Sequence, residues 1–171
     1  MRRIWILAVT VPLAVAGLAG PSWATQSSPK PSNEHVTITF NAATPQSPGT
    51  VAATGPIAGS GTATSSKNHH VGRVRFDVVT LTFGTGTVTV RDIRARGERK
   101  LDSSTCTVTE TGKGAWLMTK GTGAYANAKG HGRFTSTATL VGTHDPSSSH
   151  GCNLKNPTGT TVFDATGNVT V

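Results

Sequence analysis

The sequence predicts an all-β protein that folds as a single antiparallel barrel. From residue 35 onward, short segments rich in Val and Thr alternate apolar and polar residues with a period of two. Clusters of Gly, Asn, Asp and Ser separate these segments, and helical spacing of apolar residues occurs only near the N-terminus. An antiparallel sandwich fits the same pattern. The barrel is favoured because closure removes exposed edges, and because 5% aromatic residues are few for a densely filled sandwich.

Residues 1–24 have the features of a secretory signal peptide. Arg2 and Arg3 precede an apolar run from residue 4 to about residue 20, and Ser22-Trp23-Ala24 fits a cleavage site. Pro12 and the shortness of the run argue against a membrane helix. We therefore expect a secreted, extracellular protein with no membrane span in its mature form. The choice between the general and the twin-arginine export route stays open.

Residues 25–34 contain two prolines and no apolar residue, which predicts a flexible leader before a barrel domain of residues 35–171. The first strand is expected in "HVTITF" (35–40). The passage 41–66 is rich in Pro, Gly and Ala, so it predicts at most one or two weak strands.

The clearest hairpin joins "VGRVRFDVVTLTF" (71–83) to "TVTVRDIRAR" (87–96). The turn between them is Gly84-Thr85-Gly86, and we expect positive φ at both glycines. Further on, "STCTVTET" (104–111) and "GAWLMTK" (114–120) are expected as two short strands divided by a glycine pair. A single helical turn is expected within residues 123–129, and strands in 133–141 and 159–171 complete the chain.

Cys106 and Cys152 are the only cysteines, and export to an oxidising compartment predicts a disulfide between them. His144, Asp145 and His150 lie near Cys152, but their spacing matches no established zinc motif. We therefore expect no metal and no cofactor.

The formal net charge is +8, and many of the cations fall between residues 73 and 100. The run "RDIRARGERK" (91–100) holds no aromatic residue to stack on bases, so we expect no nucleic-acid partner. Attraction to an anionic surface polymer is left as an unspecific possibility based on charge alone.

The order of "GPIAGSGTA" (55–63), the charged hairpin and "GTGAYANAKGHGRF" (121–134) resembles the allene oxide cyclase barrel-like superfamily. That superfamily includes plant dirigent proteins and exported bacterial proteins of unassigned role. The resemblance covers residues 36–171, and its most specific part is the turn formed by Gly121, Gly123, Tyr125, Ala128 and Gly130. It implies an eight-stranded antiparallel barrel with an apolar cavity at one mouth. No catalytic residue is transferred, because the acidic and polar interior residues on which the family's activities depend are not matched residue by residue in this sequence.

Three residues are candidates for ligand binding: Arg75, Asp77 and Tyr125. Alternation puts Arg75 and Asp77 on the face of Leu81, but Phe76 and Val78 compete for the interior, and we favour the charges facing solvent. Tyr125 is expected first as a structural plug between glycines that allow a tight return, and second as a ligand contact.

The most favoured function is binding of a small apolar or aromatic ligand, or an extracellular structural role. Two alternatives are a dirigent- or cyclase-type enzyme and a basic adhesion module. The sequence identifies no catalytic constellation and leaves homo-oligomerisation open.

Overall fold

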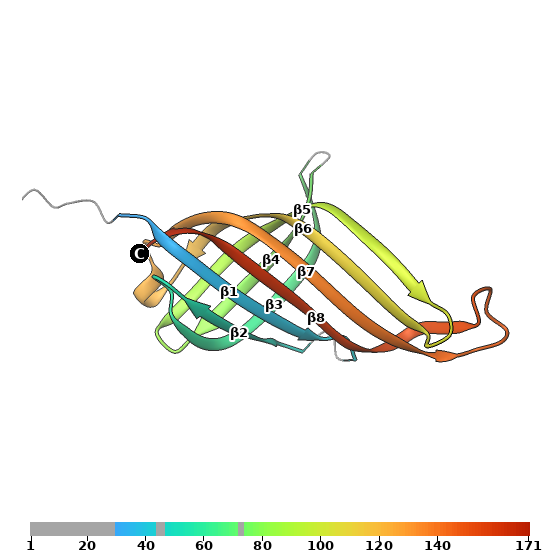
Figure 1. Ribbon diagram of the computed structural model, residues 1–171. Helices are drawn as coiled ribbons and strands as arrows, with labels where there is room; N and C mark the ends of the chain where they lie inside the picture. The colour runs from blue at the N-terminus through green and yellow to red at the C-terminus, as the bar shows by residue number, and fades with distance from the viewer. Residues whose placement is uncertain (1–29, 44–46, 72–73) are drawn as a thin grey trace, which may run out of the picture.

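The computed structural model describes residues 30–43, 47–71 and 74–171, with side chains 67–75 and 95–96 excepted, and it confirms the predicted antiparallel barrel. The predicted signal peptide lies outside the described residues. The strands close in sequence order, and β8 pairs with β1 (Figure 1). Their bounds are β1 (Ser32–Asn41), β2 (Gly49–Thr54), β3 (Gly59–Val71), β4 (Val74–Phe83), β5 (Gly86–Asp102), β6 (Thr107–Gly121), β7 (Lys129–His144) and β8 (Cys152–Thr170), with a 3₁₀ turn η1 (Gly123–Tyr125).

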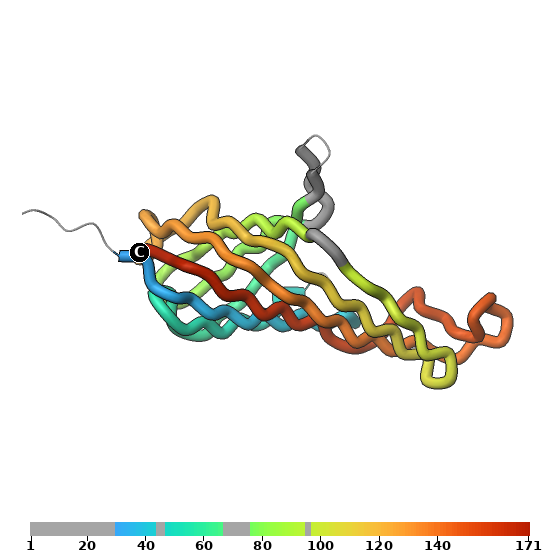
Figure 2. Tube along the Cα trace, turned by 45° about the horizontal axis from the view of Figure 1, so that its top comes forward, coloured from blue at the N-terminus to red at the C-terminus, as the bar shows by residue number. Residues whose placement is uncertain are grey.

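The barrel has two unlike ends, which we call the η1 end and the disulfide end. The C-terminus and η1 lie together at the first (Figure 1). Strands β5 to β8 have 15 to 19 residues each, whereas β1, β2 and β4 have 6 to 10. The longer strands therefore project beyond the others at the disulfide end (Figure 2). Within the described ranges, no helix has the length and apolarity to span a bilayer.

The core follows the period-two pattern of the sequence. In β7, Phe134 and Ala138 are buried while the threonines between them are exposed, as predicted for this segment. In β1, Val36 and Ile38 are buried on the same face. The weak strands expected in 41–66 are β2 and the first part of β3.

Two predicted boundaries were wrong. The barrel begins at Ser32 rather than at residue 35, because residues 32–34 pair with β8 and carry Glu34 into the interior. The two short strands expected on either side of a glycine pair are one continuous strand, β6. Gly114 lies within β6 and pairs with Phe134. A Cβ on Gly114 would lie 2.8 Å from the Phe134 ring, so the glycine makes room for that ring instead of ending the strand.

The predicted turn between β4 and β5 is confirmed, but its two glycines have different roles. Gly84 does not have positive φ, contrary to expectation, and a Cβ there would meet nothing within 4 Å. A Cβ on Gly86 would lie 2.2 Å from the carbonyl oxygen of Thr122. Thr122 and η1 pack against this turn, where the Ala124 amide donates to the Thr85 carbonyl at 2.9 Å.

We therefore expect Gly86→Val to lower the free energy of unfolding by roughly 3 kcal/mol, because the side chain displaces the Thr122 carbonyl. Gly84→Val is the matched control and should change stability by less than about 0.5 kcal/mol. Urea denaturation of both variants measures the difference. Equal stabilities would show that the η1 loop does not pack on this turn.

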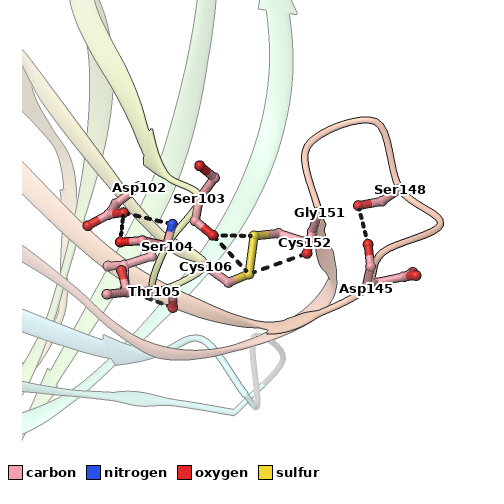
Figure 3. The surroundings of a disulfide bond; sticks show 10 residues. Asp102, Ser103, Ser104, Thr105, Cys106, Asp145, Ser148, Gly151 and Cys152 are labelled. Carbon is pink, nitrogen blue, oxygen red and sulfur yellow. Dashed lines mark hydrogen bonds between the residues drawn. A yellow bond between two sulfur atoms is a disulfide. The ribbon is translucent and has the colours of Figure 1, made fainter.

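The disulfide between Cys106 and Cys152 is present, as predicted. It joins the β5–β6 turn to the start of β8 at the tip of the projection (Figure 3). Both sulfur atoms lie close to the carbonyl oxygen of Ser103, at 3.9 and 3.6 Å. The bond therefore ties the β5–β6 turn to β8 within the projection.

Candidate functional site

Two cavities follow one another along the inside of the barrel. The wide cavity has a volume of about 760 Å³ and lies toward the disulfide end. The narrow cavity, of about 40 Å³, lies toward the η1 end. Asp92 and Phe163 line both. The wide cavity matches the size range of small-molecule sites, whereas the narrow one has room for only a few atoms.

The wide cavity has an aromatic and aliphatic floor. The rings of Phe40 and Phe163 meet edge to face with centroids 6.0 Å apart. Val79, Ala138 and Leu140 line the same space from β4 and β7. These side chains offer an apolar surface on which a flat or aliphatic ligand can pack.

The polar wall of this cavity carries charges of both signs. Arg94 Nη2 lies 3.8 Å from Asp77 Oδ2, and the Arg94 guanidinium also lies 5.6 Å from the ring centre of Phe163. Nearer the disulfide end, Arg99 Nε lies 3.3 Å from Glu110 Oε1. The cavity thus places two ion pairs beside its apolar floor.

Asp92 is the most deeply buried charged residue of the wide cavity, with 8% of its surface exposed. Burial, and to a smaller extent the nearby Asp77 carboxylate, raise the pKa of its carboxyl to about 7, while Arg94 acts in the opposite direction. At neutral pH the Asp92 carboxyl therefore exists in both protonation states. It can donate or accept a hydrogen bond, and it can transfer a proton.

The structure places Asp77 on the interior wall, so the solvent-facing orientation favoured from the sequence was wrong. Its side chain is 15% exposed and lines the wide cavity on the face of Val79 and Leu81. Phe76 occupies the outer face and is covered by Arg91, whose guanidinium lies 4.3 Å from the ring centre. Because Arg91 shields the Phe76 ring from water, Phe76 is buried on the outer face without pointing into the barrel. The side chain of Arg75 lies outside the described residues.

Sequence reasoning missed Asp92, although its pattern contained a signal. Val88, Val90 and Asp92 alternate along β5, and both valines are buried. A carboxylate two residues beyond a buried valine on an alternating strand faces the same interior. The basic run that begins at Arg91 gives the same segment the look of a solvent-exposed strand.

A single line of paired residues crosses five strands and connects Asp92 to the η1 end. Asp92 pairs with Trp116, Trp116 with Gly132, Gly132 with Gly167, and Gly167 with Glu34. Paired residues point to the same side of a sheet, so all five face the interior. A Cβ on Gly132 or Gly167 would lie 2.7 or 2.5 Å from the Trp116 indole. The two glycines therefore make room for the indole.

Glu34 lies at the far end of this line, and its burial was also missed. Only 3% of its surface is exposed, and its Oε2 accepts a hydrogen bond from the Ile57 amide at 2.9 Å. Burial raises the pKa of the Glu34 carboxyl to about 7, against the lowering effects of the Ile57 amide and His35. In the sequence, Glu34 appeared to belong to the polar leader.

Tyr125, the third candidate from the sequence, lines neither cavity. It is 6% exposed, and its ring meets Phe83 edge to face at 5.8 Å. Its hydroxyl accepts a hydrogen bond from Thr85 Oγ1 at 3.0 Å. These contacts support a structural role, in which the Tyr125 side chain packs η1 against the β4–β5 turn.

We expect Tyr125→Ala to lower the free energy of unfolding by about 3 kcal/mol or more, because it empties a packed space. Tyr125→Phe keeps the ring and should cost roughly 1 kcal/mol for the lost hydrogen bond. Thermal and urea denaturation distinguish the two variants. An alanine variant as stable as the parent would instead assign the tyrosine to a ligand.

In the part of the chain that the structure describes, no three His, Cys, Asp or Glu side chains gather as metal ligands. No family model, curated protein or solved structure matches this chain.

Proposed function

We propose that this is an exported protein that binds a small, partly apolar molecule in the wide cavity. The observation that carries the proposal is a 760 Å³ space with phenylalanines on its floor and a buried, titratable Asp92 beside them. A ring or aliphatic body packs on Phe40 and Phe163, while a polar group reaches Asp92 or Arg94. The narrow cavity is too small for such a ligand. The disulfide is consistent with an extracellular location.

The test is uptake of the neutral fluorescent probe N-phenyl-1-naphthylamine. Ala138→Trp fills the cavity from β7 and should weaken probe binding by at least about tenfold. Thr139→Trp is the matched control, because Thr139 is exposed on the outer face of the same strand. Melting curves check that both variants are folded. Unchanged uptake in a folded Ala138→Trp variant would contradict the proposal.

A second candidate function, an enzyme of the dirigent or cyclase type implied by the resemblance, is favoured by one specific feature. Asp92 is buried, has a pKa of about 7, and has Arg94 and Asp77 as neighbours. Such a carboxyl suits general acid or base chemistry at neutral pH. Under this alternative, Asp92→Asn abolishes turnover of a bound substrate while probe binding persists. Turnover unaffected by this change would exclude it.

The adhesion alternative still rests on net charge. Its signature is binding to an anionic polymer that weakens steeply with added salt and is insensitive to Ala138→Trp.

A further inference from the structure

Strand β5 has an open edge along the projection. Residues 97–102 pair regularly with residues 107–112 of β6, whereas the register between β5 and β4 ends at Asp92. Within the described part of the chain, no strand lies against the other side of this stretch (Figure 1). Alternate backbone N–H and C=O groups of residues 97–102 therefore point away from β6, with no strand to receive them. An exposed, regular edge of this kind is a template for pairing with another strand.

The side chains along this edge carry charges of opposite sign at neighbouring positions of one face. Glu98 and Lys100 are both exposed, and they share a face because side chains two residues apart on a strand point to the same side. Their cross-strand partners in β6 are Thr111 and Thr109, so β6 supplies no countercharge there. Among the described side chains, neither Glu98 nor Lys100 forms an ion pair. Both charges are therefore available to an arriving strand.

These charges select one register for pairing with the β5 edge of a second copy. Facing residues of an antiparallel pair either both direct their N–H and C=O groups toward the other strand or both direct them away. A two-fold symmetric pair of identical strands is therefore centred on a residue rather than between two residues. Centring on Glu98 or on Lys100 puts like charges opposite each other, which is destabilising. Centring on Arg99 places Glu98 of each copy opposite Lys100 of the other.

The opposite face of the strand is compatible with the same register. Arg99 faces Arg99 of the second copy, but its Nε already lies 3.3 Å from Glu110 Oε1, so each positive charge is compensated within its own chain. Gly97 faces Leu101, and the missing side chain of the glycine leaves space for the leucine. All the facing residues lie within the regular stretch 97–102, beyond the register shift between Arg94 and Arg96.

We propose that the β5 edges of two copies pair in antiparallel orientation about Arg99 and form a two-fold symmetric dimer. Main-chain hydrogen bonds supply the affinity, and the two Glu98–Lys100 pairs fix the register. Because each copy uses its open β5 edge, the assembly closes at two chains. The other edge of the projection, in β8, competes poorly. It contains Pro157, and its pairing with β7 shifts register between Val141 and Thr143.

The test is sedimentation velocity of the full-length, disulfide-bonded protein over a range of concentrations. We expect a monomer–dimer equilibrium with a Kd on the order of 100 µM or below. Amide hydrogen exchange at residues 97–101 should slow as the dimer forms. A protein that is monomeric at about 1 mM, or that forms assemblies larger than a dimer, would overturn the proposal.

Charge reversal tests the register. Glu98→Lys and Lys100→Glu should each weaken dimerisation at least about tenfold, because each change puts like charges opposite each other in both cross-strand pairs. The double variant Glu98→Lys with Lys100→Glu restores opposite charges and should dimerise like the parent. A mixture of the two single variants should form a mixed dimer, because the two lysines of one chain then face the two glutamates of the other.

Lys120→Glu is the matched control, since Lys120 is exposed on β6 and pairs with Thr89, outside the projection. It should leave dimerisation unchanged, and melting curves check that every variant is folded. Dimerisation that is insensitive to the single reversals would place the contact elsewhere and contradict the proposal. So would single variants that lose dimerisation without recovery in the double variant or in the mixture.

Discussion

The free energy of unfolding is expected to fall by roughly 6 kcal/mol between pH 4 and pH 8 through Glu34 and Asp92 alone. Both carboxyls have a folded-state pKa of about 7, above their ordinary values of 4.5 and 3.8. A raised pKa means that the folded state favours the protonated form. The stabilisation is therefore complete below about pH 4 and is lost as the pH rises through 7, with about 3 kcal/mol for each group.

The variants Glu34→Gln and Asp92→Asn isolate this effect. Each should be less sensitive to pH than the parent by about 3 kcal/mol over this range, as measured by urea denaturation at several pH values. The comparison with the parent matters because Asp102 and Asp145 act in the opposite direction. Hydrogen bonds from Ser104 and Ser147 lower their pKa values, which favours folding at higher pH. Parallel stability curves for parent and variants would contradict the burial of the two carboxyls.

Loss of the disulfide is expected to lower the free energy of unfolding by about 4 kcal/mol. The two cysteines are 46 residues apart, so the bond restricts a long loop in the unfolded chain. The double variant Cys106→Ser and Cys152→Ser should unfold at lower urea concentration, and the oxidised parent should contain no alkylatable thiol. The Ser103→Ala variant is a control for local changes in the turn, since Ser103 contacts the sulfur atoms through its backbone carbonyl, which the substitution keeps. A double variant as stable as the parent would show that the tip contributes nothing to cooperative unfolding.

This disulfide should matter most for the projection formed by β5 to β8. Among the described residues, β5 beyond Asp92 pairs with β6 alone at the disulfide end, because its register with β4 ends at Asp92. This part of β5 therefore has a hydrogen-bonded neighbouring strand on one side only. In the double variant, amide hydrogen exchange should be faster at residues 97–110 than in the strands of the barrel interior.

The sequence by itself determined the class of the fold and much of its strand order. Period-two alternation is a local property, so the burial of Val36, Ile38 and Phe134 followed directly from it. The turn at residues 84–86 and the disulfide were equally readable, because turn chemistry and cysteine count need no knowledge of neighbouring strands.

The tertiary structure alone decided the candidate site. Whether Asp77 or Phe76 faces inward depended on Arg91 from β5, which covers Phe76 on the outside. The role of Gly132 and Gly167 depended on Trp116 from another strand, which lies over both. Glu34 became a buried carboxyl only through its pairing with Gly167 and its bond to Ile57. Each of these outcomes comes from contacts between strands far apart in the sequence, and local alternation carries no information about such contacts.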